Sequence, residues 1–149
     1  MDERTEIVTT DAPRGTGAYS QAIRAGDFVF ISGQGPLDPE TLKVVGTTIE
    51  EQTGQTLRNI AAIAAAAGGS LGDAVKISAF LSSIDLFEGF NATYERIVDA
   101  LPRPARTTTG AELRGILVEI DAVGGKLARL RERRERALEA LRGVRLDGY

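Results

Sequence analysis

The feature that most constrains the fold is a helical pattern about twenty residues long, running from position 48 to position 67. Thr48 followed three residues later by Glu51 has the spacing of a capping box, which satisfies free backbone N–H groups where a helix begins. Apolar and small residues then recur at helical spacing, namely Ile49, Leu57, Ile60, Ala61 and Ala64. Two glycines follow at 68–69, which is typical of a helix end. We therefore predict a helix over 48–67.

Short apolar stretches bounded by turn residues predict strands on both sides of this helix. The expected strands are a hairpin formed by 18–26 and 28–32, then 74–82, 105–109 and 116–123. A second helix is predicted over 85–100, with an apolar face formed by Phe87, Phe90, Tyr94, Ile97, Val98 and Leu101. The order β-β-α-β-α-β-β predicts an α+β fold with two helices on one face of a sheet. Little sequence remains to cover the other face, which favours oligomerisation.

Composition limits the chemistry that this chain of 149 residues can perform. It contains no cysteine and no histidine, so nucleophilic sites built on Ser-His-Asp or Cys-His are excluded, and no metal site is expected. The net charge of −3 argues against nucleic acid as a partner. The N-terminal stretch is charged and no run of 18 apolar residues occurs, so we expect no signal peptide, no membrane partner and a cytoplasmic protein.

The last 25 residues differ in composition from the rest. The segment 125–149 holds one lysine and seven arginines against four acidic residues, a net charge of about +4, which leaves about −7 for residues 1–124. Leucines 127, 130, 138 and 141 form a narrow stripe that Arg134 interrupts. We interpret 1–124 as one domain and 125–149 as a basic amphipathic helical tail.

Several blocks of the sequence together resemble the RidA/YjgF family of imine deaminases. They are GAYSQAIRAGDFVFISGQGPLDP, EEQTGQTLRNIAAIAAAAG, FNATYE and RPARTTT followed by LVEIDAV, and they extend from about Ala12 to Val123. The resemblance implies a chorismate-mutase-like (YjgF-like) fold and a homotrimer with clefts between subunits. It also implies hydrolysis of 2-imino acids and 2-aminoacrylate to 2-oxo acids and ammonia, without a cofactor, as a detoxification reaction.

The resemblance also suggests which residues form the site. The family's carboxylate-binding arginine matches Arg106, and its strand glutamate matches Glu119; these two are the expected catalytic residues. The other substrate-binding positions that it implies are Tyr19, Gly33, Asn91 and Thr108. The chain departs from the family pattern at Ala18, where a proline is usual, and at Gly35, where a bulky aliphatic residue is usual. The connection between Arg106 and Glu119 is about two residues shorter than usual.

These residue types suit an imino acid. A guanidinium remains charged and binds a carboxylate through two parallel hydrogen bonds. Arg106 and Thr108 are two apart on a predicted strand, so they point to the same face. A glycine at 33 allows a ligand to approach the backbone closely. Glu119 is suited to orienting the attacking water and moving a proton, provided that burial raises its pKa.

Each assignment has a structural alternative. Arg106 fits a surface or interface ion pair, and Glu119 with Asp121 fits a solvated strand face. Tyr19 fits a half-buried strand residue, and Asn91 fits the polar edge of the second helix. For function, the alternative is a non-catalytic trimer that binds small carboxylates, which Gly35 and the shortened connection favour. RNA cleavage is disfavoured because the chain lacks histidine and residues 1–124 are acidic.

Overall fold

The computed structural model describes residues 3–125 and 127–142, with the side chains of all of these except 127–134. Six strands form one sheet: β1 (Thr5–Ile7), β2 (Ala22–Ala25), β3 (Phe28–Gln34), β4 (Ala74–Leu81), β5 (Ala105–Gly110) and β6 (Val118–Gly124). The helices are α1 (Ile49–Ala66), α2 (Phe87–Ile97) and α3 (Leu127–Arg142). Single 3-10 turns at Leu71–Asp73 and Ile84–Leu86 precede β4 and α2. The predicted α+β class is confirmed, with β1 as a strand that the sequence pattern missed.

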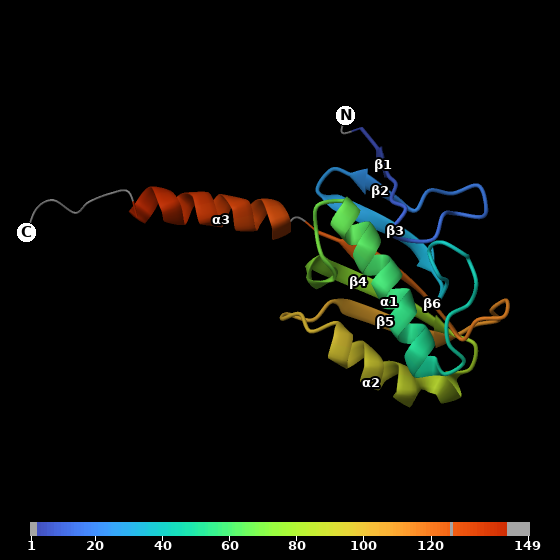
Figure 1. Cartoon of the computed structure of the whole chain (residues 1–149). Coiled ribbons are helices and arrows are strands. Elements are labelled where there is room, and N and C mark those ends of the chain that lie inside the picture. Colours follow the sequence, from blue (N-terminus) through green and yellow to red (C-terminus); the bar gives the residue numbers. More distant parts are fainter. Residues whose placement is uncertain (1–2, 126, 143–149) are drawn as a thin grey trace, which may run out of the picture.

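The strands lie in the order β1-β2-β3-β6-β4-β5. Neighbouring strands are antiparallel except β4 and β5, which are parallel, so the sheet is mixed. The parallel pair requires a crossover connection, and α2 supplies it. Figure 1 shows α1 and α2 lying side by side on one face of the sheet, as predicted. Strand β5 forms one edge of the sheet, so one side of its backbone has no partner strand among the described residues.

The core lies between these two helices and the sheet. Alternate residues of each strand face the helices, because successive side chains of a strand point to opposite faces. The side chains of Ile77, Leu81, Val118 and Ile120 are completely buried against the apolar stripe of α1, which is formed by Leu57, Ile60 and Ile63. Burying a side chain of this size stabilises the fold by about 1.5–3 kcal/mol, so this layer accounts for much of the stability.

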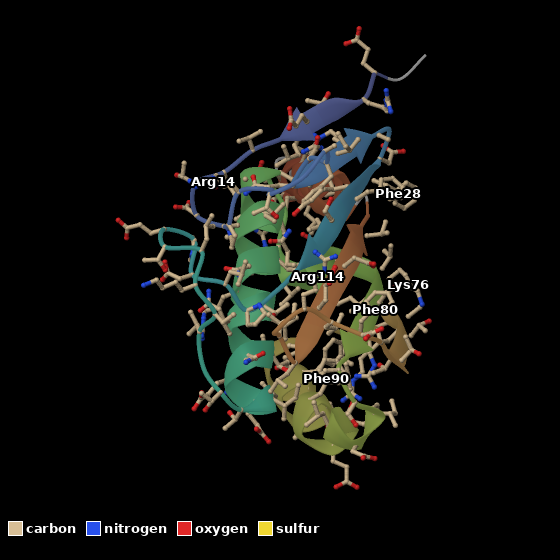
Figure 2. All side chains as sticks on the ribbon, turned by 90° about the vertical axis from the view of Figure 1, so that its right-hand side faces the viewer. Arg14, Phe28, Lys76, Phe80, Phe90 and Arg114 are labelled. Carbon is tan, nitrogen blue, oxygen red and sulfur yellow. The ribbon has the colours of Figure 1, made fainter. Side chains whose placement is uncertain are left out.

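The opposite face of the sheet carries exposed apolar side chains. Phe28 and Phe30 on β3 are 45% and 49% exposed, and their rings contact each other at a centroid distance of 6.5 Å. Figure 2 shows Phe28, Lys76 and Phe80 on the side of the sheet away from α1. No helix of the described residues covers this face, which we call the open face.

Buried polar residues of α1 hold the loops beside the sheet. Asn59 Nδ2 donates hydrogen bonds to the carbonyl oxygens of Gly35 and Leu37, at 3.0 and 2.9 Å. Gln52 Oε1 accepts from the backbone N–H of Leu117 at 2.8 Å. The two side chains fix the start of the 35–46 loop and the approach to β6, so α1 positions backbone as well as filling the core.

The helix boundaries differ from the predictions in detail. Thr48 Oγ1 accepts from the N–H of Glu51 as predicted, but the Glu51 carboxylate accepts from the N–H of Thr47 rather than completing a box on Thr48. The prediction that α2 begins at Asp85 is wrong, because a 3-10 turn capped by Ser83 Oγ occupies that position.

Helix α2 ends earlier than predicted, whereas the tail contains the predicted helix. Leu101 is 87% exposed and lies beyond the helix end at Ile97, so it does not belong to the apolar face. The tail contains the predicted helix, α3, which extends away from the sheet in Figure 1, with residues 135–142 exposed. Position 126 and positions 143–149 of the predicted tail lie outside the described residues.

Candidate ligand-binding site

Arg106 lies on β5 and faces α2. It pairs in register with Ile77 of β4, whose side chain is buried against the helices, so Arg106 projects to the same side. Its guanidinium carbon lies 4.6 Å from the ring centroid of Tyr94, 5.5 Å from that of Phe90 and 5.7 Å from that of Phe87. A cation within about 6 Å of a ring face is attracted by the ring quadrupole. The three rings of α2 therefore hold the guanidinium in a half-buried position, and we call them the aromatic cage.

No carboxylate pairs with Arg106 among the described residues. The ion pair nearby joins Arg103 Nη1 to Glu95 Oε1 at 3.8 Å, and both of its side chains are more than half exposed. Arg106 therefore forms no surface ion pair within the described residues, and the alternative of an ion pair across an interface stays a prediction. A partly desolvated guanidinium without an anionic partner has its hydrogen-bonding edge available to an anion.

A cavity of about 270 Å³ opens beside Arg106, close to the lower limit of the usual range for ligand pockets. Its lining includes Asn91, Tyr94, Arg103, Pro104 and Arg106, together with Glu95 and Val98. The structure therefore brings Asn91 and Arg106 together, as the resemblance implied. We call this cavity the arginine pocket.

Two hydroxyl groups near Arg106 are buried without a hydrogen-bond partner in the described part of the chain: Tyr94 OH and Thr108 Oγ1. Burial raises the pKa of the Tyr94 phenol, and the positive charges of Arg106 and Arg103 oppose the shift. Tyr94 therefore stays protonated at neutral pH and is a potential donor. Thr108 follows Arg106 by two positions on β5 and points to the same face, as predicted. Buried hydroxyl groups usually have partners, so these two favour a ligand with oxygen atoms.

Tyr19, Gly33 and Glu119 form a second group around β3. Tyr19 and Gly33 line a smaller cavity of about 60 Å³, together with loop residues 13–16 and the 34–37 segment. A bulge in the β3–β6 pairing, between Ile31 and Gln34, places Gly33 against the Glu119 side chain. A Cβ added at Gly33 would overlap Glu119 Oε1, so this close approach requires glycine.

The loop that carries Tyr19 is held by a residue that sequence reasoning did not single out. Gln21 Nε2 donates to the carbonyl oxygens of Thr9, Ala12 and Pro13, at 2.9–3.2 Å, and Gln21 Oε1 accepts from the N–H of Thr9. Tyr19 itself is 52% exposed, and its hydroxyl accepts from the N–H of Thr16 at 3.3 Å. The prediction of a half-buried strand tyrosine is wrong, because Tyr19 belongs to the loop before β2.

The two groups are apart within one chain. Gly33 on β3 and Arg106 on β5 are separated by β6 and β4, a span of about 14 Å at the usual spacing between strands. Arg106 faces the helices, whereas Glu119 pairs with Phe80 and faces the open face. The six predicted residues therefore form two half-sites: Asn91, Arg106 and Thr108 in one, and Tyr19, Gly33 and Glu119 in the other.

Sequence reasoning missed the aromatic cage as part of the site. The helical spacing of Phe87, Phe90 and Tyr94 predicted an apolar face, which is correct for Phe90, a completely buried residue seen on α2 in Figure 2. The spacing carries no sign that Arg106 lies above these rings. Among the described residues, no group of three or more acidic side chains is arranged to hold a metal ion.

The described helices are all too short or too polar to cross a membrane. A mixed sheet with two helices on one face and a pocket at its edge strand defines a small α+β protein. Residues 9–125 match the family described as Endoribonuclease L-PSP. The chain belongs to this family, which is the RidA/YjgF family, so the resemblance read from its motifs is confirmed.

Individual relatives support the same assignment. A RutC family protein of Pyrococcus horikoshii is 40% identical over 121 residues, which cover 80% of this chain and 96% of that protein. Reactive Intermediate Deaminase A, chloroplastic, of Arabidopsis thaliana is 41% identical over 106 residues, 70% of this chain and 56% of that protein. The crystal structure of E. coli TdcF with bound serine superposes with a TM-score of 0.77 at 31% identity, covering 81% of this chain and 98% of that one. The YjgF-like fold is therefore confirmed.

Proposed function

We propose that the protein hydrolyses reactive 2-imino acids, including the tautomers of 2-aminoacrylate, to 2-oxo acids and ammonia without a cofactor. The observation that carries the proposal is Arg106, a guanidinium held by three rings at a cavity, with no carboxylate partner among the described residues. The name of the Arabidopsis relative, a reactive intermediate deaminase, supports this reaction class. The serine bound in TdcF is a 2-amino acid, which shares the carboxylate next to the nitrogen-bearing carbon with a 2-imino acid, so it supports the ligand class.

The proposed active form is a homotrimer in the cytoplasm, with its sites between subunits. One chain has the two half-sites about 14 Å apart on different faces of the sheet, too far apart to contact the same small substrate. Packing of the open face, with its exposed Phe28 and Phe30, against neighbouring subunits removes this apolar surface from water. The same packing brings the half-site of Gly33 and Glu119 in one subunit against the arginine pocket of the next.

In this site Arg106 binds the carboxylate of the imino acid through its fork. Tyr94, a lining residue of the arginine pocket, is the proposed hydroxyl donor to the same ligand, since its OH has no partner among the described residues. Thr108 faces the same side of β5 as Arg106, and its proposed role is to support the ligand from that strand. Glu119 of the neighbouring half-site orients a water molecule toward the C=N carbon. Water adds, with its oxygen bonding to carbon and a proton passing to nitrogen, and gives a carbinolamine. Loss of ammonia from that carbon leaves the 2-oxo acid. Orientation of water and substrate supplies much of the acceleration.

The test is hydrolysis of 2-iminobutanoate, generated in the cuvette by an amino-acid oxidase with catalase present and followed by competition with semicarbazide. Semicarbazide traps the free imine, so a deaminase lowers the rate at which the semicarbazone forms. We expect the protein to lower that rate in proportion to its concentration. A protein that binds 2-oxobutanoate but leaves the rate unchanged supports the alternative, a non-catalytic carboxylate-binding trimer.

Mixed oligomers test the placement of the site between subunits. Arg106→Ala disables one half-site and Glu119→Gln the other, so each variant alone loses activity. Trimers reassembled from equal amounts of both contain some interfaces with two intact half-sites. We expect part of the activity to return after mixing, unfolding and refolding together. No recovery from properly assembled mixed trimers contradicts an intersubunit site.

A further inference from the structure

The arginine pocket contains a second guanidinium that the proposed reaction does not use. Arg103 lines the cavity with Arg106 and lies three residues before it. Both positive charges act on the same buried group, because both lower the pKa of Tyr94 against the effect of its burial. The pocket thus has two cationic groups around one phenol, whereas a monocarboxylic imino acid has a single carboxylate to offer.

The local partner of Arg103 is weakly bound. Its contact with Glu95 measures 3.8 Å, and the two side chains are 68% and 51% exposed, so the pair contributes little and is easily exchanged. Pro102 and Pro104 flank Arg103 and restrict its backbone, and Arg103 and Pro104 both line the pocket. Replacing Glu95 by a ligand carboxylate therefore requires only a rearrangement of exposed side chains.

A second observation points to an anionic oxygen-rich ligand. Tyr94 lines the pocket and is 6% exposed, and its buried hydroxyl has no hydrogen-bond partner among the described residues. Asn91 adds an amide to the same lining. A monocarboxylate bound to Arg106 leaves the charge of Arg103 and at least part of this donor set without a ligand partner.

We propose that the preferred substrates are imino acids with a second carboxylate in the side chain, with Arg106 binding the 2-carboxylate and Arg103 binding the distal one. This inference rests on the proposed function for the reaction, but the binding preference for dicarboxylates stands on the pocket alone. Arg103 is then a specificity-determining residue, released from Glu95 when the substrate enters.

The experiment compares 2-iminoglutarate with 2-iminobutanoate, each generated in the cuvette from its amino acid by an oxidase, in the wild type, Arg103→Gln and Arg96→Gln. Arg96 is an exposed arginine of α2 outside the pocket lining, so Arg96→Gln is the matched control for the loss of one positive charge. We expect Arg103→Gln to lower kcat/KM for 2-iminoglutarate by roughly tenfold, as befits a partly exposed charge-assisted contact, and that for 2-iminobutanoate by less than about twofold. Glu95→Gln, which frees Arg103, is expected to favour 2-iminoglutarate further.

Calorimetric binding of 2-oxoglutarate and 2-oxobutanoate separates failure of this inference from failure of the proposed function. If the protein shows no deamination yet binds 2-oxoglutarate more tightly in an Arg103-dependent way, the function is wrong and the dicarboxylate site stands. If it deaminates both imines with equal efficiency and Arg103→Gln changes neither, the site preference is wrong and the function stands. Equal losses in Arg103→Gln and Arg96→Gln indicate a general charge effect and also contradict the inference.

Discussion

Replacing Arg106 by alanine tests the central residue of the proposed site. The guanidinium is half-buried above the three rings of the aromatic cage, and it has no carboxylate partner in the described residues. Removing one partner from a desolvated, hydrogen-bonded charge pair costs about 2–5 kcal/mol. At about 1.4 kcal/mol for each tenfold change, kcat/KM for 2-iminobutanoate falls by roughly 30-fold to several thousand-fold.

The same substitution affects the stability of the chain. Arg106 packs on Phe87, Phe90 and Tyr94, so its truncation loses cation–π attraction of about 0.5–2 kcal/mol. A loss of this size lowers Tm by several degrees and leaves the protein folded. The expected effect on stability is therefore small but measurable.

Two further variants separate binding from packing. Arg106→Met keeps an unbranched side chain over the rings but has no charge, so it recovers the packing part of the stability and neither the cation–π attraction nor the activity. Arg106→Lys keeps charge without the planar fork, so it recovers only part of kcat/KM. Imine hydrolysis by semicarbazide competition, thermal unfolding and light scattering are measured on all three, with Arg96→Ala, at an exposed position of α2, as a control. An Arg106→Ala protein that remains assembled and retains full kcat/KM refutes the assignment of Arg106 to the carboxylate.

Four other expectations follow from the geometry. Gly33→Ala forces the Glu119 carboxylate away from β3, so kcat is expected to fall at least tenfold while thermal unfolding shows a cost near 1 kcal/mol; unchanged kcat in a folded variant contradicts the role of this contact. Phe30→Glu places charge on the open face and is expected to yield monomers in light scattering, with loss of activity, whereas trimers of full activity contradict burial of this face. Deleting 125–149 should leave assembly and turnover within about twofold, because residues 135–142 of α3 are exposed; loss of the trimer would show that the tail is structural. A strong chelator should leave turnover unchanged, since the chain has neither histidine nor cysteine, and loss that added metal restores is the contrary result.

The helices were predictable because their signals are local. Thr48, the spacing of Leu57, Ile60 and Ile63, and the glycines at 68–69 all lie within one segment, and α1 differs from the predicted span by a single residue at each end. The alternation that buries Val118, Ile120 and Ala122 was likewise readable from the sequence. The start of α2 was not, because Ser83 competes with Asp85 as a cap and forms a 3-10 turn first.

The site was predictable only in part, because its geometry depends on contacts between distant segments. The order of strands places β6 between β3 and β4, and nothing in residues 118–124 specifies those neighbours. The bulge that sets Gly33 against Glu119 is a property of the β3–β6 register rather than of either strand alone. The aromatic cage could not be predicted either, because its contacts exist only where α2 packs above β5. Resemblance to the family supplied the residues, and the structure supplied their division into two half-sites.

That division follows from the topology of the sheet. The parallel strands β4 and β5 require a crossover, and a helix that makes it packs back on the strands it connects. The inner face of α2 therefore lies over the edge strand, so its aromatic residues are placed around Arg106 by the β4–α2–β5 unit alone. Gly33 and Glu119 belong to the antiparallel pair β3–β6, which fixes them independently of α2. Because Arg106 with its rings is fixed by one unit and Gly33 with Glu119 by the other, a subunit can fold with both arrangements preformed, and the proposed assembly needs only to bring one against the other. Preformed halves lower the entropy lost when substrate binds, so we expect the site to gain its full affinity at the step of assembly rather than through refolding of either unit.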